Sequence, residues 1–166
     1  MIFTTKAEYG VRLLVELGRH AAEPQPTPTS LKAIAEAEGL PLAYLERIVA
    51  LLKKAGLVES TRGAHGGYRL ARPADDVRMD EVVLALEGAV APMTCFVDDS
   101  EHGRVLCNHE ADRGHGCATK LLWTRVQGGV VKALQGTTLA DLVAFSDRHS
   151  PAPDAPAPVG DALPVA

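Results

Sequence analysis

The sequence predicts a mainly α-helical fold that carries one small β-ribbon, and three observations lead to this fold class. Apolar residues recur every three or four positions over most of the chain, which is the spacing of one face of a helix. Two short β-rich segments flank a glycine-rich stretch at residues 62–67, which is typical of a hairpin. Aromatic residues make up only 4% of the 166 residues, so the core must consist of Leu, Val, Ile and Ala.

The first helix is predicted over residues 6–20. Thr4 and Thr5 stand at its start, and a threonine hydroxyl suits the position that caps the free N–H groups of a helix. Residues 22–28 contain three prolines, which lack an N–H group and therefore end the helix and form a loop. The apolar face of this helix is formed by Tyr9, Leu13, Leu14 and Leu17.

Two further helices are predicted to follow, joined by a tight turn. Ser30 caps a short helix over residues 31–38, and Gly39 suits the left-handed conformation in which many helices end. Pro41 fits the first position of the next helix, residues 41–54, because its fixed φ is already helical. Two helices joined in this way form the outline of a helix-turn-helix. The apolar positions of the second helix are Leu42, Leu45, Ile48, Val49 and Leu52.

A β-ribbon is predicted directly after this pair of helices. Residues 57–61 and 68–70 read as its two strands, and glycines make the tip at residues 62–67 flexible. Arg62 gives that tip a positive charge. Helix, turn, helix and a basic-tipped ribbon together predict a winged helix-turn-helix DNA-binding domain, which we place in residues 1–90.

The rest of the chain divides by composition. Residues 79–87 read as a fourth helix that completes the N-terminal domain. Residues 91–117 show no periodicity and hold all three cysteines, which predicts a loop that binds a cofactor. Residues 147–166 are rich in proline and alanine and are predicted to be disordered.

Residues 117–146 are predicted to contain two helices. The longer covers residues 117–134, and Thr138 and Asp141 have the spacing of a capping box that starts a short helix over residues 139–145. An apolar stripe follows the long helix, at Leu121, Leu122, Val126, Val130 and Leu134.

The net charge of −4 hides an uneven distribution of charge along the chain. Residues 1–72 carry 10 Lys and Arg against 7 Asp and Glu, whereas residues 73–166 carry 7 against 14. A basic N-terminal part suits a module that contacts DNA phosphates. The start of the chain lacks the basic-then-apolar order of a signal peptide, and no apolar run approaches the roughly 18 residues that span a bilayer. We therefore expect a cytoplasmic protein without membrane contact.

Residues that face away from the core on the third helix and at the ribbon tip are candidate DNA contacts. Tyr44 suits a phosphate, Glu46 can accept from a cytosine amino group, and Arg47 can reach guanine or phosphate. Lys53 and Lys54 suit contacts with the DNA backbone. Arg62 suits a minor groove, whose negative potential attracts a guanidinium. The full candidate set is Ala43, Tyr44, Glu46, Arg47, Lys53, Arg62 and His65.

The cysteine segment indicates a metal or redox site. Cys95, Cys107 and Cys117 fall within 23 residues that contain glycines and many charges, unlike the apolar surroundings of structural cysteines. Thiolates are ligands that select iron–sulfur clusters or zinc. The absence of a Cys-x-x-Cys pair from the sequence disfavours a zinc knuckle. Free redox-active thiols, zinc and inert cysteines remain as alternatives to a cluster.

Three stretches of the sequence are similar to a known family. They read TTKAEYGVRLLVEL, LPLAYLERIVALLKKAGLVESTRGAHGGYRLARP and CATKLLW followed by TLADLV. Together they resemble the Rrf-type family of bacterial winged-helix iron–sulfur transcription regulators, to which IscR and NsrR belong, over residues 1–146. The resemblance implies a homodimer in which the long helix packs against its partner. It also implies binding to double-stranded operator DNA, in a pseudo-palindromic site, and an iron–sulfur cluster in the cysteine segment.

The resemblance also bears on the fourth cluster ligand. IscR-like members have a histidine three residues after the last cysteine, where this sequence has Lys120. Nitric oxide sensors of the family use a carboxylate near the N-terminus, and Glu8 occupies the matching position. We hypothesise that Glu8 of the other subunit completes a 4Fe–4S cluster, with 2Fe–2S as the alternative type. His109 and His115 are rival ligands.

The main interpretation is a cluster-containing regulator that senses nitric oxide, oxygen, redox or iron–sulfur status, and three other functions compete with it. One is a cluster-free regulator of the same fold, switched by cysteine oxidation or a small ligand. Another is a thiol oxidoreductase, but no cysteine pair has redox-motif spacing, and no glycine-rich phosphate loop or Ser/His/Asp constellation stands out. A third is a protein–protein adaptor built on the same scaffold. We expect a regulator and not an enzyme.

Overall fold

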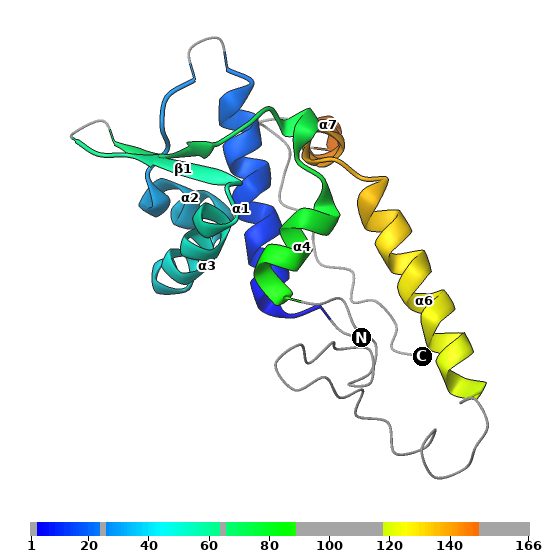
Figure 1. The fold of residues 1–166 in the computed structure, drawn as a ribbon. Coiled ribbons are helices and arrows are strands. Elements are labelled where there is room, and N and C mark those ends of the chain that lie inside the picture. The colour runs from blue at the N-terminus through cyan, green and yellow to red at the C-terminus, as the bar shows by residue number, and fades with distance from the viewer. Residues whose placement is uncertain (1–2, 24–25, 64–65, 89–117, 150–166) are drawn as a thin grey trace, which may run out of the picture.

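The computed structural model describes residues 3–23, 26–63, 66–88 and 118–149. Figure 1 shows helices packed around α1, a two-stranded ribbon on one side and α6 extending on the other. The mainly α-helical fold class with one small ribbon is confirmed. Its elements are α1 (Thr5–Ala21), α2 (Leu31–Glu38), α3 (Leu42–Lys54), β1 (Val58–Thr61), β2 (Gly67–Leu70), the 3₁₀ helix η1 (Ala74–Asp76), α4 (Met79–Glu87), α6 (Ala118–Gln135) and α7 (Leu139–His149).

The ends of the first helices follow from local capping chemistry. The Thr4 hydroxyl accepts a hydrogen bond from the Lys6 N–H at 3.2 Å, and the Ser30 hydroxyl accepts one from the Ala33 N–H at 3.1 Å. Gly39 ends α2 with a φ of 62°, as predicted. Pro41 was predicted as the first helical residue of α3 but is its N-cap, because its ψ of 118° is extended.

Helix α1 lies at the centre of the core. It contacts α2, α3, α4, α7 and β2, so all of these elements bury apolar side chains against it. Two glycines allow close helix packing. A Cβ on Gly18 would lie 2.7 Å from Val143 of α7, and one on Gly10 would collide with Leu86 of α4. The largest fully buried side chains are Leu13, Leu14, Leu17, Ile34, Leu45, Ile48, Leu52, Leu57, Leu86, Leu139, Val77 and Val82.

Helix α7 is attached to the N-terminal elements by backbone hydrogen bonds and one ion pair. The Met79 N–H donates to the Thr137 carbonyl at 3.0 Å, and the Leu139 N–H donates to the Val77 carbonyl at 2.8 Å. At the far end of α7, Asp147 pairs with Arg19 of α1 at 3.1 Å. The helix continues to His149, four residues beyond its predicted end, because its later turns lie along α1.

The predicted capping box starts α7. The Asp141 carboxylate accepts hydrogen bonds from the N–H and the hydroxyl of Thr138, both at 2.8 Å. In return, the Asp141 N–H donates to the Thr138 hydroxyl at 3.2 Å. The backbone hydrogen bond from Thr138, followed by the side-chain one, holds the pKa of Asp141 below its ordinary value of 3.8.

We expect Asp141→Asn to lower the free energy of unfolding near neutral pH. A lowered pKa in the folded state contributes stability above the ordinary pKa and loses it as pH falls through the folded value. The difference between variant and wild type should therefore shrink below the ordinary value of 3.8. Urea unfolding at stepwise pH measures it. Asp75→Asn, an exposed change in η1, is the control and should give no such pH dependence. A difference that stays constant into acid would contradict this origin.

The apolar stripe of α6 changes from packed to exposed along the helix. Leu134, near the C-terminal end, is half-buried against the core. Leu122 and Val126 are 56% and 38% exposed in the single chain. Figure 1 shows that the N-terminal part of α6 extends away from the other helices. Within the described ranges, no helix combines the length and the apolar composition that crossing a bilayer requires.

Candidate nucleic-acid interface

Helix α3 presents one face to the core and the other to solvent. Its four buried residues are at most 3% exposed, and they anchor the helix. They are Leu45, Ile48, Val49 and Leu52. Leu42 was predicted to belong with them but is 39% exposed, since it precedes the turn at which α3 meets the core. The predicted contact residues Ala43, Glu46, Arg47 and Lys53 are all exposed.

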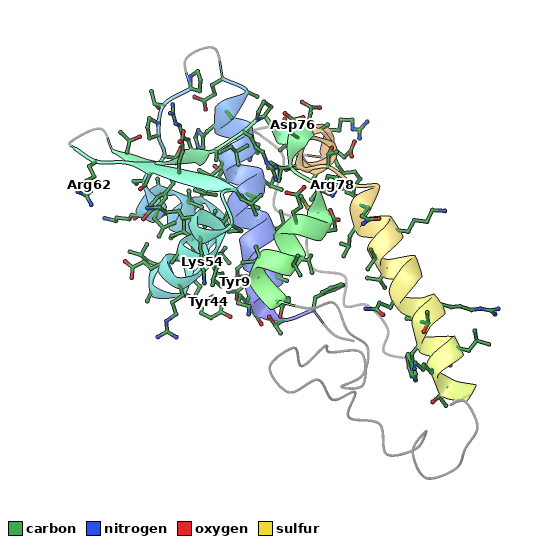
Figure 2. The ribbon with its side chains drawn as sticks, viewed as in Figure 1. Tyr9, Tyr44, Lys54, Arg62, Asp76 and Arg78 are labelled. Carbon is green, nitrogen blue, oxygen red and sulfur yellow. The ribbon has the colours of Figure 1, made fainter. Side chains whose placement is uncertain are left out.

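Tyr44 is oriented by a second tyrosine. Its ring meets that of Tyr9 on α1 edge to face, with ring centroids 5.6 Å apart and planes at 87°. Figure 2 shows the two rings together where α1 and α3 begin. Both are half-buried and pack against the core. Edge-to-face pairs are a favoured aromatic geometry, so each ring restricts the other.

The starts of α1 and α3 also line an open pocket of about 460 Å³. Tyr9 was predicted only as a core residue, and Thr5 only as a capping residue, so this shared surface was missed. The sequence gives no direct sign of it, because the two helices are joined through α2. The residues that line the pocket are Thr5, Tyr9, Pro41, Ala43, Tyr44 and Arg47.

Strands β1 and β2 form the predicted antiparallel ribbon, which we call the wing. Its register pairs Glu59 with Arg69, and their side chains form an ion pair. The Lys53 ammonium donates to the Ser60 hydroxyl at 2.7 Å, which links the end of α3 to β1. Arg62 follows β1 and is exposed at the tip (Figure 2). His65 lies outside the described residues.

Three cations of this region make no ion pair or hydrogen bond within the described part of the chain. They are Arg47 and Lys54 on α3 and Arg62 on the wing. By contrast, most other described cations of the N-terminal elements face carboxylates at 4.0 Å or less. These paired cations are Lys6, Arg12, Arg19, Lys32, Arg69, Arg72 and Arg78. Among the described residues of the N-terminal elements, the cations without an ion pair therefore lie on α3 and the wing, where a polyanion can bind them.

Glu8 lies on a different side of α1. Its exposed side chain lines an apolar pocket of about 330 Å³ between α1, α4, α6 and α7. The Thr4 hydroxyl hydrogen-bonds Glu87 at the end of α4, so the start of α1 is tied to that helix. The other lining residues are Phe3, Ala7, Val11, Met79, Val83, Ala133, Leu134, Thr137 and Leu142.

Of the predicted cluster ligands, Glu8 lies among the residues that the structure describes. Cys95, Cys107 and Cys117 lie outside the described residues, as do the rivals His109 and His115. Among the residues that are described, no group of three His, Cys, Asp or Glu side chains is placed to hold a metal ion. Glu8 forms no ion pair with the described residues, and thiolates combined with a carboxylate are ligand types that suit iron.

Comparison with known proteins decides the family. A sequence model of a family described as "Rrf2: Iron-dependent Transcriptional regulator" matches residues 3–145. The chain belongs to the Rrf2 family. The Rrf2-family match covers the wing, the helix-turn-helix, α6 and most of α7, and it spans the undescribed cysteine segment.

Three relatives show how far the likeness extends. Protein rrf2 of Nitratidesulfovibrio vulgaris is 38% identical over 86% of this chain and 87% of its own. The structure of T. potens IscR has a TM-score of 0.71 at 34% identity and covers 92% of this chain and 93% of that one. The structure of CymR, titled the global cysteine regulator of B. subtilis, has a TM-score of 0.69 at 34% identity, covering 87% and 98%.

The comparisons settle the general activity of this Rrf2-family protein. Other relatives are named as HTH-type transcriptional regulators and not as enzymes. The protein is therefore a DNA-binding transcriptional regulator, and the predicted resemblance and fold class are confirmed. The arrangement of α2, α3 and the wing is the part of the fold that suits DNA.

Proposed function

We propose that the protein is a homodimeric cytoplasmic regulator that binds a pseudo-palindromic operator through α3 and the wing. The observation that carries this proposal is that Arg47, Lys54 and Arg62 on these two elements form no ion pair with the described residues, while neighbouring cations are neutralised. In a winged helix, the recognition helix enters the major groove. The exposed face of α3 then meets base edges, and Arg62 enters the adjacent minor groove.

Each exposed residue of α3 has a role that follows from its chemistry. Glu46 accepts a hydrogen bond from a cytosine amino group, and the small Ala43 leaves room for a thymine methyl group. Arg47 and Tyr44 bind at the edge of the groove. Lys53 contacts the DNA backbone while its bond to Ser60 keeps it near the wing. His65 adds a wing-tip contact.

The dimer is proposed to form through α6. Leu122 and Val126 are exposed on the part of the helix that extends from the body, so a second copy of α6 would bury them. Gly128 and Gly129 lie within the same helix, and a Cβ at either position would meet nothing within 4 Å. Glycine inside a helix costs about 1 kcal/mol relative to alanine. A close partner helix would explain their presence.

The signal is proposed to be read by an iron–sulfur cluster, of the 4Fe–4S type or alternatively 2Fe–2S. Cys95, Cys107 and Cys117 would supply three ligands and Glu8 of the partner subunit the fourth. Bound there, a cluster would supply a redox-active centre sensitive to nitric oxide, oxygen, redox poise or iron–sulfur status. The cysteine thiolates would hold it, and Glu8 would add a weaker oxygen ligand. Because Glu8 is on α1, a shift in its position moves the start of that helix.

A second candidate function keeps the operator binding and omits the cluster. Cysteine oxidation or a small ligand would then set the activity. The observation that favours it is the structural likeness to CymR, which is titled a cysteine regulator. Protein purified without oxygen distinguishes the two, because only the first predicts bound iron and sulfide with visible absorbance.

Selection from a random-duplex library tests the DNA-binding proposal. We expect the protein to enrich a pseudo-palindrome whose half-sites are about one helical turn, roughly 34 Å, apart. The selection is run on anaerobically purified protein and on protein stripped of metal by a chelator. Failure of both forms to enrich any sequence would overturn the proposed function.

Glu8→Ala tests the fourth ligand. We expect the anaerobic variant to show altered visible absorbance and faster loss of iron in air, because one oxygen ligand is missing. Absorbance spectra and iron release over time provide the measurement. Glu36→Ala removes an exposed glutamate of α2, which faces Lys32 at 3.8 Å, and should match wild type. An unchanged spectrum together with an unchanged rate of iron loss would remove Glu8 from the ligand set.

A further inference from the structure

We propose that the pocket between the starts of α1 and α3 seats one phosphate of the DNA backbone, so that α1 is itself part of the DNA interface. This inference rests on the proposed operator binding and adds Tyr9 and Thr5 to the contact surface. It also assigns Arg47 to phosphate in preference to a base edge. The pocket measures about 460 Å³ and is open to solvent.

The charge of the pocket favours an anion. Arg47 is its one charged lining residue, and no carboxylate is among the residues that line it. The guanidinium makes no ion pair within the described ranges, although Glu46 is adjacent in sequence. A phosphate matches the planar fork of arginine donors and gives a stronger hydrogen bond than a neutral partner does.

Hydroxyl donors surround the same space. Thr5, Tyr9 and Tyr44 all line the pocket, and each offers one O–H group to an anion oxygen. The edge-to-face contact between the two tyrosine rings restricts their movement before any ligand arrives. An interface that is ordered in advance loses less conformational entropy on binding.

The start of α3 adds a fixed positive field. Thr4 and Ser30 cap α1 and α2 through their side chains, whereas Pro41 provides no side-chain cap for α3. The N–H groups of the first turn of α3 therefore lack a side-chain acceptor, and the helix dipole is positive at this end. Together with Arg47 and the hydroxyls, this end of α3 completes a set of hydrogen-bond donors that has no carboxylate among its lining residues.

The position of the pocket identifies DNA as the source of the phosphate. Ala43 and Arg47 both line the pocket and belong to the exposed face of α3 that carries Glu46. When that face meets base edges, the sugar-phosphate backbone at the groove edge lies next to it. A single arginine binds a free ion weakly, whereas the remaining contacts of the duplex hold its phosphate in place.

Tyr9→Phe tests the proposal because it removes one hydroxyl and retains the ring that contacts Tyr44. We expect operator affinity to fall about tenfold, as for loss of a hydrogen bond to a charged group. Affinity for a random duplex should fall by a similar factor, since a phosphate contact carries no sequence information. Arg47→Gln should also lower the salt dependence of binding by about one counterion.

Uncharged substitutes for single phosphates of the DNA locate the phosphate that the pocket contacts. Operator duplexes carry a methylphosphonate at one position of each half-site, and the position is varied. A methylphosphonate at the phosphate that Tyr9 contacts should weaken wild-type binding about tenfold. The same substitution should weaken Tyr9→Phe binding much less, because that variant already lacks the hydrogen bond from the Tyr9 hydroxyl. Arg148→Gln on α7, near the opposite end of α1 from the pocket, is the control and should respond like wild type at every position.

The outcomes separate this inference from the proposed function. If wild type binds a selected operator but no methylphosphonate position couples to Tyr9 or Arg47, the phosphate seat is wrong and operator binding stands. If Tyr9→Phe weakens only the selected operator, Tyr9 reads sequence or supports α3, and the phosphate assignment again fails. If wild type selects no DNA sequence, both are overturned.

Discussion

Aspartate in place of Leu122 and Val126 is expected to leave the protein monomeric and to lower its operator affinity by at least about a hundredfold. The two side chains are 56% and 38% exposed in the single chain, so in a dimer they supply apolar surface at its interface. Four buried carboxylates across two copies would repel each other and lose hydration. Operator affinity falls because two linked subunits bind their half-sites about 10² to 10⁴ times more tightly than one subunit binds a single half-site.

Sedimentation velocity and operator binding are measured on the same preparation. Thr124 and Gln135 are exposed on the opposite face of α6, and changing both to aspartate adds the same charge without touching the stripe. This control should remain dimeric and bind normally. Circular dichroism checks that helix content is retained in both variants. A variant at Leu122 and Val126 that stays dimeric would show that α6 does not form the interface by this face.

Arg47→Gln combined with Arg62→Gln is expected to reduce operator affinity by about a hundredfold or more. Neither guanidinium has a carboxylate partner among the described residues, so neither change should break an internal contact. A hydrogen bond that involves a charged group is worth roughly 1.5–3 kcal/mol, so the loss of two such contacts accounts for a hundredfold effect. The dependence of affinity on salt should also decrease, because fewer counterions are released on binding.

Lys132→Gln with Arg148→Gln provides the matched control. Both residues are exposed on α6 and α7, and the pair removes the same charge from elements that the proposal keeps off the DNA. Titrations at several salt concentrations should show a near-normal slope for this control. Equal losses in the two double variants would mean that total charge, and not its location on α3 and the wing, sets the affinity.

Local chemistry made the N-terminal elements predictable. Thr4, Ser30 and Gly39 mark helix ends through groups within a few residues, so their positions follow from the sequence alone. The two short β-rich segments on either side of the glycine-rich tip likewise predicted the wing. Pro41 was misplaced by one position because its fixed φ suits both the cap and the first turn, and only ψ distinguishes them.

Features that depend on distant packing could not be read from the sequence. Leu42 fits the apolar spacing of α3, but the core does not cover the first residue of that helix. Tyr9 fits the apolar face of α1, yet the approach of α3 makes it the wall of a pocket. Helix α7 was predicted too short because its last turns gain support from α1 and the Arg19–Asp147 pair.

Glu8 and Tyr9 are consecutive residues of α1, but they line different pockets. A chimaera that joins residues 1–88 to the cysteine segment of another Rrf2-family protein would thus carry over both the proposed metal ligand and the proposed phosphate contact. Exchange of any fragment that contains the whole of α1 brings both residues from the same parent. Engineering a new response in this protein therefore calls for point changes within a single turn of α1, since exchange of whole elements cannot separate the two.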